Sequence, residues 1–178
     1  YALRHAIRSA IYSRSRTRLL DLFIPGEPVS MFSYWSEVPE FNVIRIEEKT
    51  DSSIGEMNLT FYPTVHSVPG FGVKITTVEA SLFYTGDTAY HAQLENGATG
   101  VDLLLAETTM LAAETEYAIK RGHMTTRDVG FLARKSCPGL LLCTHLWPGY
   151  SREQIETEIR SFYTEKFIMA RCGMQFTI

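Results

Sequence analysis

Cysteine is scarce in this sequence. The 178 residues contain only Cys137, Cys143 and Cys172, and no two of them have Cys-x-x-Cys spacing. This pattern excludes a disulfide-rich secreted scaffold and a zinc ribbon, because both require closely spaced pairs of cysteines. Such low cysteine usage is typical of a reducing compartment, so we expect a cytoplasmic location.

Long apolar runs and a strong net charge are also missing. No apolar stretch approaches the roughly 20 residues that span a bilayer, no signal-peptide pattern is visible, and the net charge is −3. We therefore expect no membrane partner and no general affinity for nucleic acid. Five arginines nevertheless crowd the first eighteen residues, where they form either a solvated helix face or a patch for an anionic ligand. They are Arg4, Arg8, Arg14, Arg16 and Arg18.

The first half of the chain contains one helical pattern followed by strand patterns. A composition of 45% hydrophobic residues suits one globular domain over residues 1–178. Helical spacing predicts a helix from Tyr1 to about Leu22, and the segment "IPGEPVS" predicts a loop. Alternating apolar and polar residues then predict closely spaced, antiparallel strands. These are Phe41–Glu48, Glu56–His66, Phe71–Thr77 and Ala80–Asp87.

The pattern changes in the second half. Gly100–Thr108 and Pro138–Leu146 contain continuous apolar runs, as expected for strands that are covered on both faces. Thr125–Ser136 and Ser151–Tyr163 begin with capping residues and carry apolar stripes, so both are predicted helices. Glu165–Gly173 is the last predicted strand. The sequence therefore predicts an α/β unit with helices packed on a mixed sheet.

Polar residues stand where these strands end. His66, Asp87, Glu107 and His145 each close a predicted strand, and His123 lies in the turn before a helix. Strand carboxyl ends in layered α/β sheets are the usual place for ligand-binding groups, because the loops there converge. Imidazole and carboxylate are good ligands for zinc and similar divalent metals, and two adjacent metals can activate water for phosphoester cleavage.

Each residue taken alone has an ordinary explanation. His66 could be a structural strand-end residue, and Asp87 could bond its own backbone in a turn. Glu107 could cap a helix or pair with an arginine, and His145 could be a buried, hydrogen-bonded histidine. Only the combination is informative, since no His-x-x-x-His spacing occurs. The two remaining histidines lie in polar surroundings and are interpreted as surface residues: His5 and His91.

Several motifs in order resemble one known family. The segments "VHSVPGFGVKI", "SLFYTGDT", "GVDLLLAETTM", "GHMTTRDVGFLARKS" and "LLLCTHLWPGY" are similar to the second half of a metallo-β-lactamase-fold hydrolase, in the ribonuclease Z-like, phosphodiesterase-like branch. The resemblance covers roughly His66 to Tyr150. It implies an αββα sandwich, of which this chain is the C-terminal part without the N-terminal strands.

The resemblance also implies a role for each strand-end residue. His66 and His145 match metal-binding histidines, and Asp87 matches the aspartate that bridges two metals. His123 matches a histidine near the scissile phosphate, where it could donate a proton or stabilise charge, and Glu107 matches an acidic position that orients it. The implied cofactor is a pair of divalent ions, zinc first, with manganese or iron also compatible.

The sequence departs from the family in two ways. The signature His-x-His-x-Asp-His occurs nowhere, so the chain is expected to begin downstream of it, with metal ligands too few to hold two ions well. Ribonuclease Z proteins also insert a long arm that grips transfer RNA between the positions of His66 and Asp87. Here that interval fits only two predicted strands, which disfavours transfer RNA and favours a smaller phosphodiester or ester.

Two principal hypotheses follow. The chain is part of a metal-dependent hydrolase that uses metal-activated water, or it is a non-catalytic, metal-incomplete module of the same fold. In either case exposed strand edges predict a homo-oligomer or pairing with a missing N-terminal half. A metal-free ligand-binding domain is a third reading. Trp147 and Tyr150, beside His145, could line a pocket for a base or an acyl group, or could belong to the core.

Overall fold

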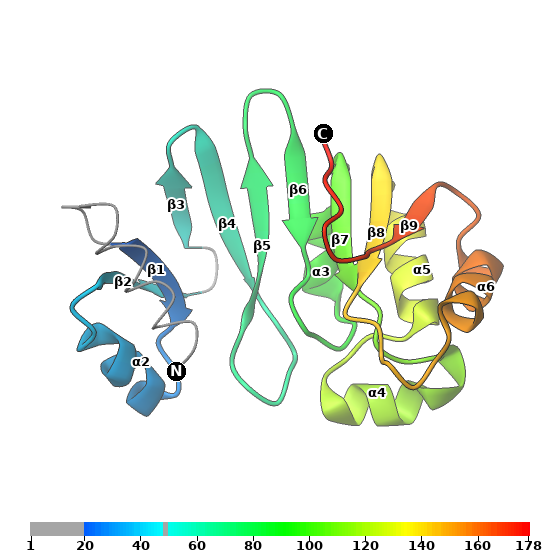
Figure 1. Cartoon of the computed structure of the whole chain (residues 1–178), viewed down its shortest axis with the longest axis horizontal. Helices are drawn as coiled ribbons and strands as arrows, with labels where there is room; N and C mark the ends of the chain where they lie inside the picture. The colour runs from blue at the N-terminus through cyan, green and yellow to red at the C-terminus, as the bar shows by residue number, and fades with distance from the viewer. Residues whose placement is uncertain (1–19, 48–49) are drawn as a thin grey trace. The chain divides into compact units, whose positions relative to one another are not determined.

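The computed structural model describes residues 20–47 and 50–178. The chain forms two compact units, Tyr1–Glu47 and Glu48–Ile178, which are described separately (Figure 1). Most of the predicted N-terminal helix and all five of its arginines lie outside the described residues. The predicted end of that helix is wrong, because Leu20–Leu22 belong to a strand. No helix within the described ranges has both the length and the apolar character needed to cross a membrane.

The described part of the first unit is a strand–helix–strand segment. Strand β1 (Leu20–Pro25) pairs in parallel with β2 (Phe41–Ile46), and helix α2 (Val29–Ser36) lies between them in sequence. The predicted loop was therefore too long. Pro28 occupies the helix N-cap with an extended backbone, so the proline that suggested a loop instead precedes a helix.

The second unit is built on a mixed sheet of seven strands in sequential order. The first four are antiparallel neighbours: β3 (Asp51–Ile54), β4 (Met57–Pro63), β5 (Phe71–Thr76) and β6 (Ser81–Tyr84). The next three run parallel to β6: β7 (Leu103–Glu107), β8 (Leu140–Thr144) and β9 (Phe167–Met169). The mixed sheet is confirmed. Strand β3 was missed because its sequence, DSSI, has only one large apolar residue.

The helices of the second unit are α3 (Ala92–Ala98), the 3₁₀ turn η1 (Ala112–Glu114), α4 (Thr115–Arg121), α5 (Thr126–Ser136) and α6 (Arg152–Phe162). Helices α5 and α6 were predicted, and both begin with the expected capping box, at Thr125 and Ser151. Helices α3 and α4 were missed. Each has only seven residues, too few for a clear amphipathic period.

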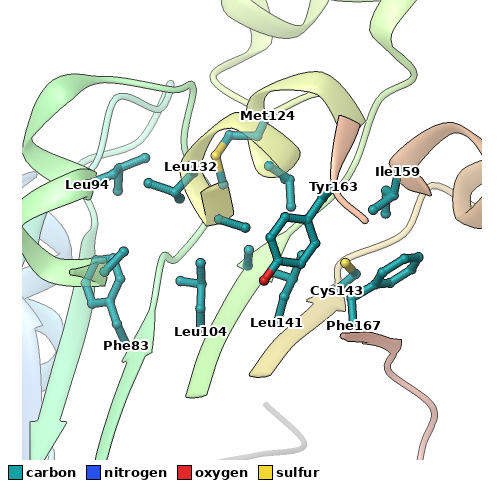
Figure 2. Close-up of a cluster of buried hydrophobic side chains, with 14 of the residues drawn as sticks. Phe83, Leu94, Leu104, Met124, Leu132, Leu141, Cys143, Ile159, Tyr163 and Phe167 are labelled. Carbon is teal, nitrogen blue, oxygen red and sulfur yellow. The ribbon is translucent and has the colours of Figure 1, made fainter. Parts of the chain in front are cut away.

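The core of the second unit lies between the helices and the parallel strands (Figure 2). Phe83, Leu104 and Leu141 come from β6, β7 and β8, and Leu132 and Ile159 come from α5 and α6. All five are fully buried. Burial of each such side chain stabilises the folded state by about 1.5–3 kcal/mol. This packing fixes the three parallel strands, and with them the positions of their carboxyl ends.

Candidate metal and active site

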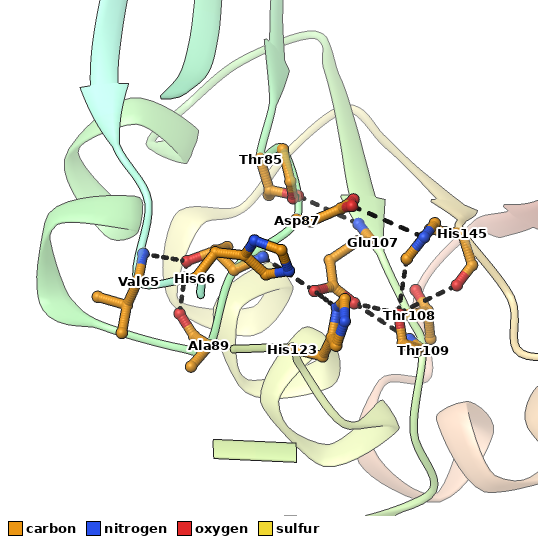
Figure 3. Close-up of polar contacts among 12 residues, drawn as sticks. Val65, His66, Thr85, Asp87, Ala89, Glu107, Thr108, Thr109, His123 and His145 are labelled. Carbon is orange, nitrogen blue, oxygen red and sulfur yellow. Dashed lines mark hydrogen bonds and ion pairs between the residues drawn. The ribbon is translucent and has the colours of Figure 1, made fainter. Parts of the chain in front are cut away.

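Four of the predicted site residues gather at one edge of the sheet (Figure 3). Strands β6, β7 and β8 are parallel, so their carboxyl ends meet at the same edge. Asp87 follows β6, Glu107 ends β7 and His145 follows β8. Strand β4 runs in the same direction as β6, because β5 is antiparallel to both, and the loop after it brings His66 to this edge.

Backbone hydrogen bonds fix the loop that carries His66. The Val65 amide donates to Thr88 Oγ1 at 3.0 Å, and the Ala89 amide donates to the Val65 carbonyl at 2.9 Å. These bonds tie the segment after β4 to the segment after β6. The side chain of His66 is less constrained, since its Nδ1 lies 3.4 Å from the Val68 amide nitrogen, too far for a strong hydrogen bond.

A glycine turn brings the remaining histidine to the site. Helix α4 ends at Gly122, whose φ of 76° lies in the left-handed region. A Cβ atom at this position would lie 2.6 Å from His66 Cα, so glycine allows the two loops to touch. The His123 ring then lies 5.1 Å from the His66 ring and 5.4 Å from the His145 ring, measured between centroids. Three imidazoles therefore converge.

Glu107 is fully buried and its carboxylate is saturated with hydrogen bonds. Oε1 accepts from the Thr88 amide at 3.0 Å and contacts His123 Nδ1 at 2.9 Å. Oε2 accepts from the Thr109 amide at 3.2 Å and from the Thr109 hydroxyl at 2.6 Å. A carboxylate has about four lone-pair sites, and all are occupied here. The arrangement orients His123, whose Nδ1 donates to Glu107 while its Nε2 remains available.

Glu107, His123 and His145 could in principle hold a metal together, because they offer ligand atoms that all lie within 4.8 Å of one another. The hydrogen bonds argue against that grouping. The Glu107 oxygen that bound the ion would have to release a hydrogen-bond partner inside a fully buried site, at the cost of an unsatisfied donor. The geometry instead suits Glu107 and His123 as a carboxylate–imidazole pair beside His145 and Asp87.

Thr109 sets the tautomer of His145. The Thr109 hydroxyl has one proton and lies closest to the Glu107 carboxylate, to which it donates. His145 Nδ1, 2.8 Å from the same oxygen, must therefore be the donor in that contact. The lone pair of the neutral ring is then on Nε2, which lies 3.7 Å from Asp87 Oδ2. A metal-binding histidine is commonly oriented in this way through its other nitrogen.

Besides Gly122, two residues at this edge have a left-handed backbone, Gly86 and His145. Gly86, before Asp87, has a φ of 64°, and a Cβ there would lie 3.1 Å from the Phe71 carbonyl oxygen. His145 has a φ of 52°, which is strained for a residue with a Cβ. Strain of this kind costs about 1–3 kcal/mol and is concentrated at functional sites.

The site creates a negative electrostatic field. Burial raises the pKa of Tyr84, and the negative charges of Asp87 and Glu107 raise it further. Asp87 is partly exposed, so its carboxylate is open to a ligand.

Sequence reasoning missed the threonines of the site. Thr85 Oγ1 accepts from the Glu107 amide at 3.1 Å, and Thr88 and Thr109 hold the carboxylate itself. The only available signal was the threonine after each acidic residue, in Gly-Asp-Thr and Glu-Thr-Thr. The surface reading of His91 was wrong, because the residue is partly buried at the start of α3 and burial lowers its pKa.

The fold and the site can now be compared with known proteins. The family described as "Beta-lactamase superfamily domain" matches residues 17–146. The chain belongs to this family. In sequence it is 26% identical, over 119 residues, to the "Probable metallo-hydrolase YhfI" of Bacillus subtilis, a match that covers 67% of this chain and 48% of that protein. It is 32% identical, over 99 residues, to a ribonuclease Z of Bradyrhizobium sp., covering 56% of this chain and 31% of the relative.

Solved structures agree on the metallo-β-lactamase fold. The crystal structure of YhfI from Bacillus subtilis superimposes with a TM-score of 0.88 at 21% identity, and the match covers 97% of this chain and 70% of that one. The short form of human tRNase Z has a TM-score of 0.61 at 16% identity, covering 75% and 62%. Two of the curated relatives match over most of this chain, and the match spans about half the length of each relative.

Proposed function

We propose that this chain supplies part of the active site of a metal-dependent hydrolase that cleaves phosphodiester or other ester bonds. The observation that carries the proposal is the convergence of His66, Asp87 and His145 at one sheet edge, beside the buried Glu107–His123 pair. Two imidazoles and a carboxylate suit zinc, manganese or iron. When bound, the metals would activate water and neutralise the developing oxyanion.

Within this proposal, His66 and His145 are metal ligands and Asp87 bridges two ions, zinc being the first expectation. These three side chains are fewer than two ions require, since a zinc site normally has at least three protein ligands per ion. We therefore propose that the remaining ligands come from another part of the complete protein. If they do not, the chain is a non-catalytic, partner-binding module of the same fold.

His123 is proposed to act on the substrate rather than on the metal. Its Nδ1 contacts the buried Glu107 carboxylate at 2.9 Å, so Nε2 is held facing the site. In its protonated form the ring can donate a proton to the leaving oxygen, or it can stabilise charge on a phosphoryl oxygen. Glu107 acts through His123, by fixing the ring orientation and stabilising the imidazolium.

A small substrate fits the chain better than transfer RNA. Between His66 and Asp87 the structure has only β5, β6 and short connections, which leave no room for a long substrate-gripping arm. Ribonuclease Z relatives support cleavage of a phosphorus–oxygen bond, and the metallo-hydrolase YhfI supports metal-dependent hydrolysis more generally.

The test combines metal content with hydrolysis, on the complete gene product. Bound metal is measured by mass spectrometry, and hydrolysis is measured with bis(p-nitrophenyl) phosphate and p-nitrophenyl acetate. Asp87→Asn is expected to lose both metal and activity. His123→Ala is expected to keep its metal while losing about 10²–10⁴-fold in rate. Asp51→Asn, in the exposed edge strand β3, is the matched control and should change neither.

Three outcomes would contradict the proposal. Metal loss in His123→Ala would indicate that Glu107, His123 and His145 form the metal site instead. Full activity in Asp87→Asn would remove its bridging role. If the wild-type protein has neither bound metal nor hydrolytic activity, the hydrolase proposal is wrong and the non-catalytic module is the remaining hypothesis.

A further inference from the structure

A pocket opens directly beside the proposed reaction site. Its volume is about 600 Å³, and His123 and His145 form part of its wall. The rest of the wall comes from the segment after β7, the 3₁₀ turn η1, helix α4 and the loop after β8. Apart from the two histidines, the charged and aromatic side chains of the wall are Glu114, Tyr117, Arg121, Trp147 and Tyr150.

One wall combines an aromatic ring with a positive charge. Tyr117 and Arg121 lie one turn apart on α4, and the Arg121 guanidinium carbon is 5.2 Å from the centre of the Tyr117 ring. Both side chains are exposed, so neither serves the core. Gly122 and then His123 follow at once, so the guanidinium is positioned two residues from the proposed proton donor.

The second part of the pocket wall is an exposed tryptophan that packs on its own turn. Trp147 is 51% exposed. It begins a turn in which the Tyr150 amide donates to the Trp147 carbonyl at 3.2 Å, with Pro148 in the second position. A Cβ atom on Gly149 would lie 2.7 Å from Trp147 Nε1, so the indole lies directly over this glycine. The result is an aromatic surface that packs on Gly149 and faces solvent.

A polar pair completes the lining. The Tyr150 hydroxyl donates to Glu114 Oε2. Burial, followed by this hydrogen bond, raises the pKa of Tyr150 to about 12, so the phenol stays a neutral donor. Glu114 Oε1 makes no hydrogen bond to any residue that the structure describes, and it can therefore accept one from a ligand.

We propose that this pocket binds the nucleoside part of a phosphodiester substrate. A base would stack on Trp147, its amino group would donate to Glu114, and Arg121 would pair with phosphate charge. Base–aromatic stacking and arginine–phosphate pairing are the usual means by which proteins hold nucleotides. An acyl chain could neither pair with the Arg121 charge nor donate a hydrogen bond to Glu114 Oε1. The inference rests on the proposed function and adds a substrate class to it.

The experiment measures binding, which separates it from catalysis. Adenosine 5′-monophosphate and ribose 5-phosphate are titrated into the complete protein by calorimetry; the two probes differ only in the base. The wild type is expected to bind the nucleotide about tenfold more tightly, a typical value for stacking one base. Trp147→Ala should abolish this preference, and Trp147→Phe should keep most of it. Phe131→Ala removes a similarly exposed aromatic side chain on α5, outside the pocket, and should have no effect.

Two further variants sharpen the result. Gly149→Ala should reduce the preference by displacing the indole, and Arg121→Gln should weaken both probes to the same extent. Equal binding of the two probes by the wild type, or an unchanged preference in Trp147→Ala, would overturn the pocket assignment. The preference should persist in Asp87→Asn, because both probes have the same phosphate. The pocket and the metal-dependent activity can therefore fail independently.

Discussion

Replacing Thr109 with valine is expected to loosen the site at its centre. Valine has nearly the same shape, and Thr109 is only 2% exposed, so the change removes a hydroxyl without opening a cavity. That hydroxyl donates to Glu107 Oε2 at 2.6 Å and contacts His145 Nδ1 at 2.8 Å. One substitution therefore affects both the carboxylate that orients His123 and the imidazole that faces Asp87.

The magnitude follows from these two contacts. Glu107 Oε2 keeps only its bond to the Thr109 amide at 3.2 Å, and the loss of a charge-assisted bond to a buried carboxylate costs about 1.5–3 kcal/mol. For a protein of this size each 1 kcal/mol lowers the Tm by about 2–4 °C, so that loss lowers the Tm by about 3–12 °C. His145 is partly exposed, so its Nδ1 can bind water when the Thr109 hydroxyl is lost. The expected effect at His145 is therefore on metal affinity, because loss of a group that orients a metal-binding histidine lowers metal affinity by about 10–100-fold.

The assay compares three proteins. Thermal unfolding of the metal-free form gives the stability change, and competition with a chromogenic chelator gives metal affinity. Thr109→Ser keeps the hydroxyl and is the matched control, expected to remain close to wild type in metal affinity. If the valine and serine variants have the same metal affinity, the hydroxyl does not orient His145 and the tautomer argument is wrong.

Two other predictions concern the backbone and the pH dependence. Gly122→Ala places a Cβ 2.6 Å from His66 Cα at a positive φ, so it should separate the loops of His66 and His123 and lower metal content and activity. The control is Gly55→Ala, which is also at a positive φ but has open space around it and should affect stability alone. Asp102 accepts from the hydroxyl and amide of Ser81, and these bonds lower the pKa of Asp102. Its contribution to stability is therefore present above the unfolded pKa of about 3.9 and is lost as the pH falls through the lower, folded value. Asp102→Asn should destabilise the protein at pH 7 and lose that effect near pH 2 in urea titrations; an equal effect at both pH values would refute the linkage.

Much of the second unit could be predicted from local pattern. Continuous apolar runs marked β7 and β8, because parallel strands buried on both faces need them. Capping residues marked the starts of α5 and α6. The short helices α3 and α4 gave no comparable signal, and β3 is too polar. In these segments tertiary packing outweighs local propensity.

The candidate site divides in the same way. The sequence alone placed His66, Asp87, Glu107 and His145 at the ends of strands, and the convergence of loops at strand carboxyl ends was the reason to expect that they meet. It could not show that His123 and the Thr88 amide bind the Glu107 carboxylate, because these contacts join residues that are distant in the chain, and it did not assign a role to Thr109, which lies only two residues after Glu107.

What the sequence determined by itself is therefore the chemistry available, which is imidazole and carboxylate at the carboxyl ends of apolar strands. What only the tertiary structure decided is how that chemistry is divided. Four hydrogen bonds saturate Glu107 and make it an orienting group, whereas Asp87 remains partly exposed and open to a ligand. The physical reason is that a carboxylate's role depends on which of its lone pairs are already occupied, and two of these partners, the Thr88 amide and the His123 ring, come from loops that only the folded sheet brings together.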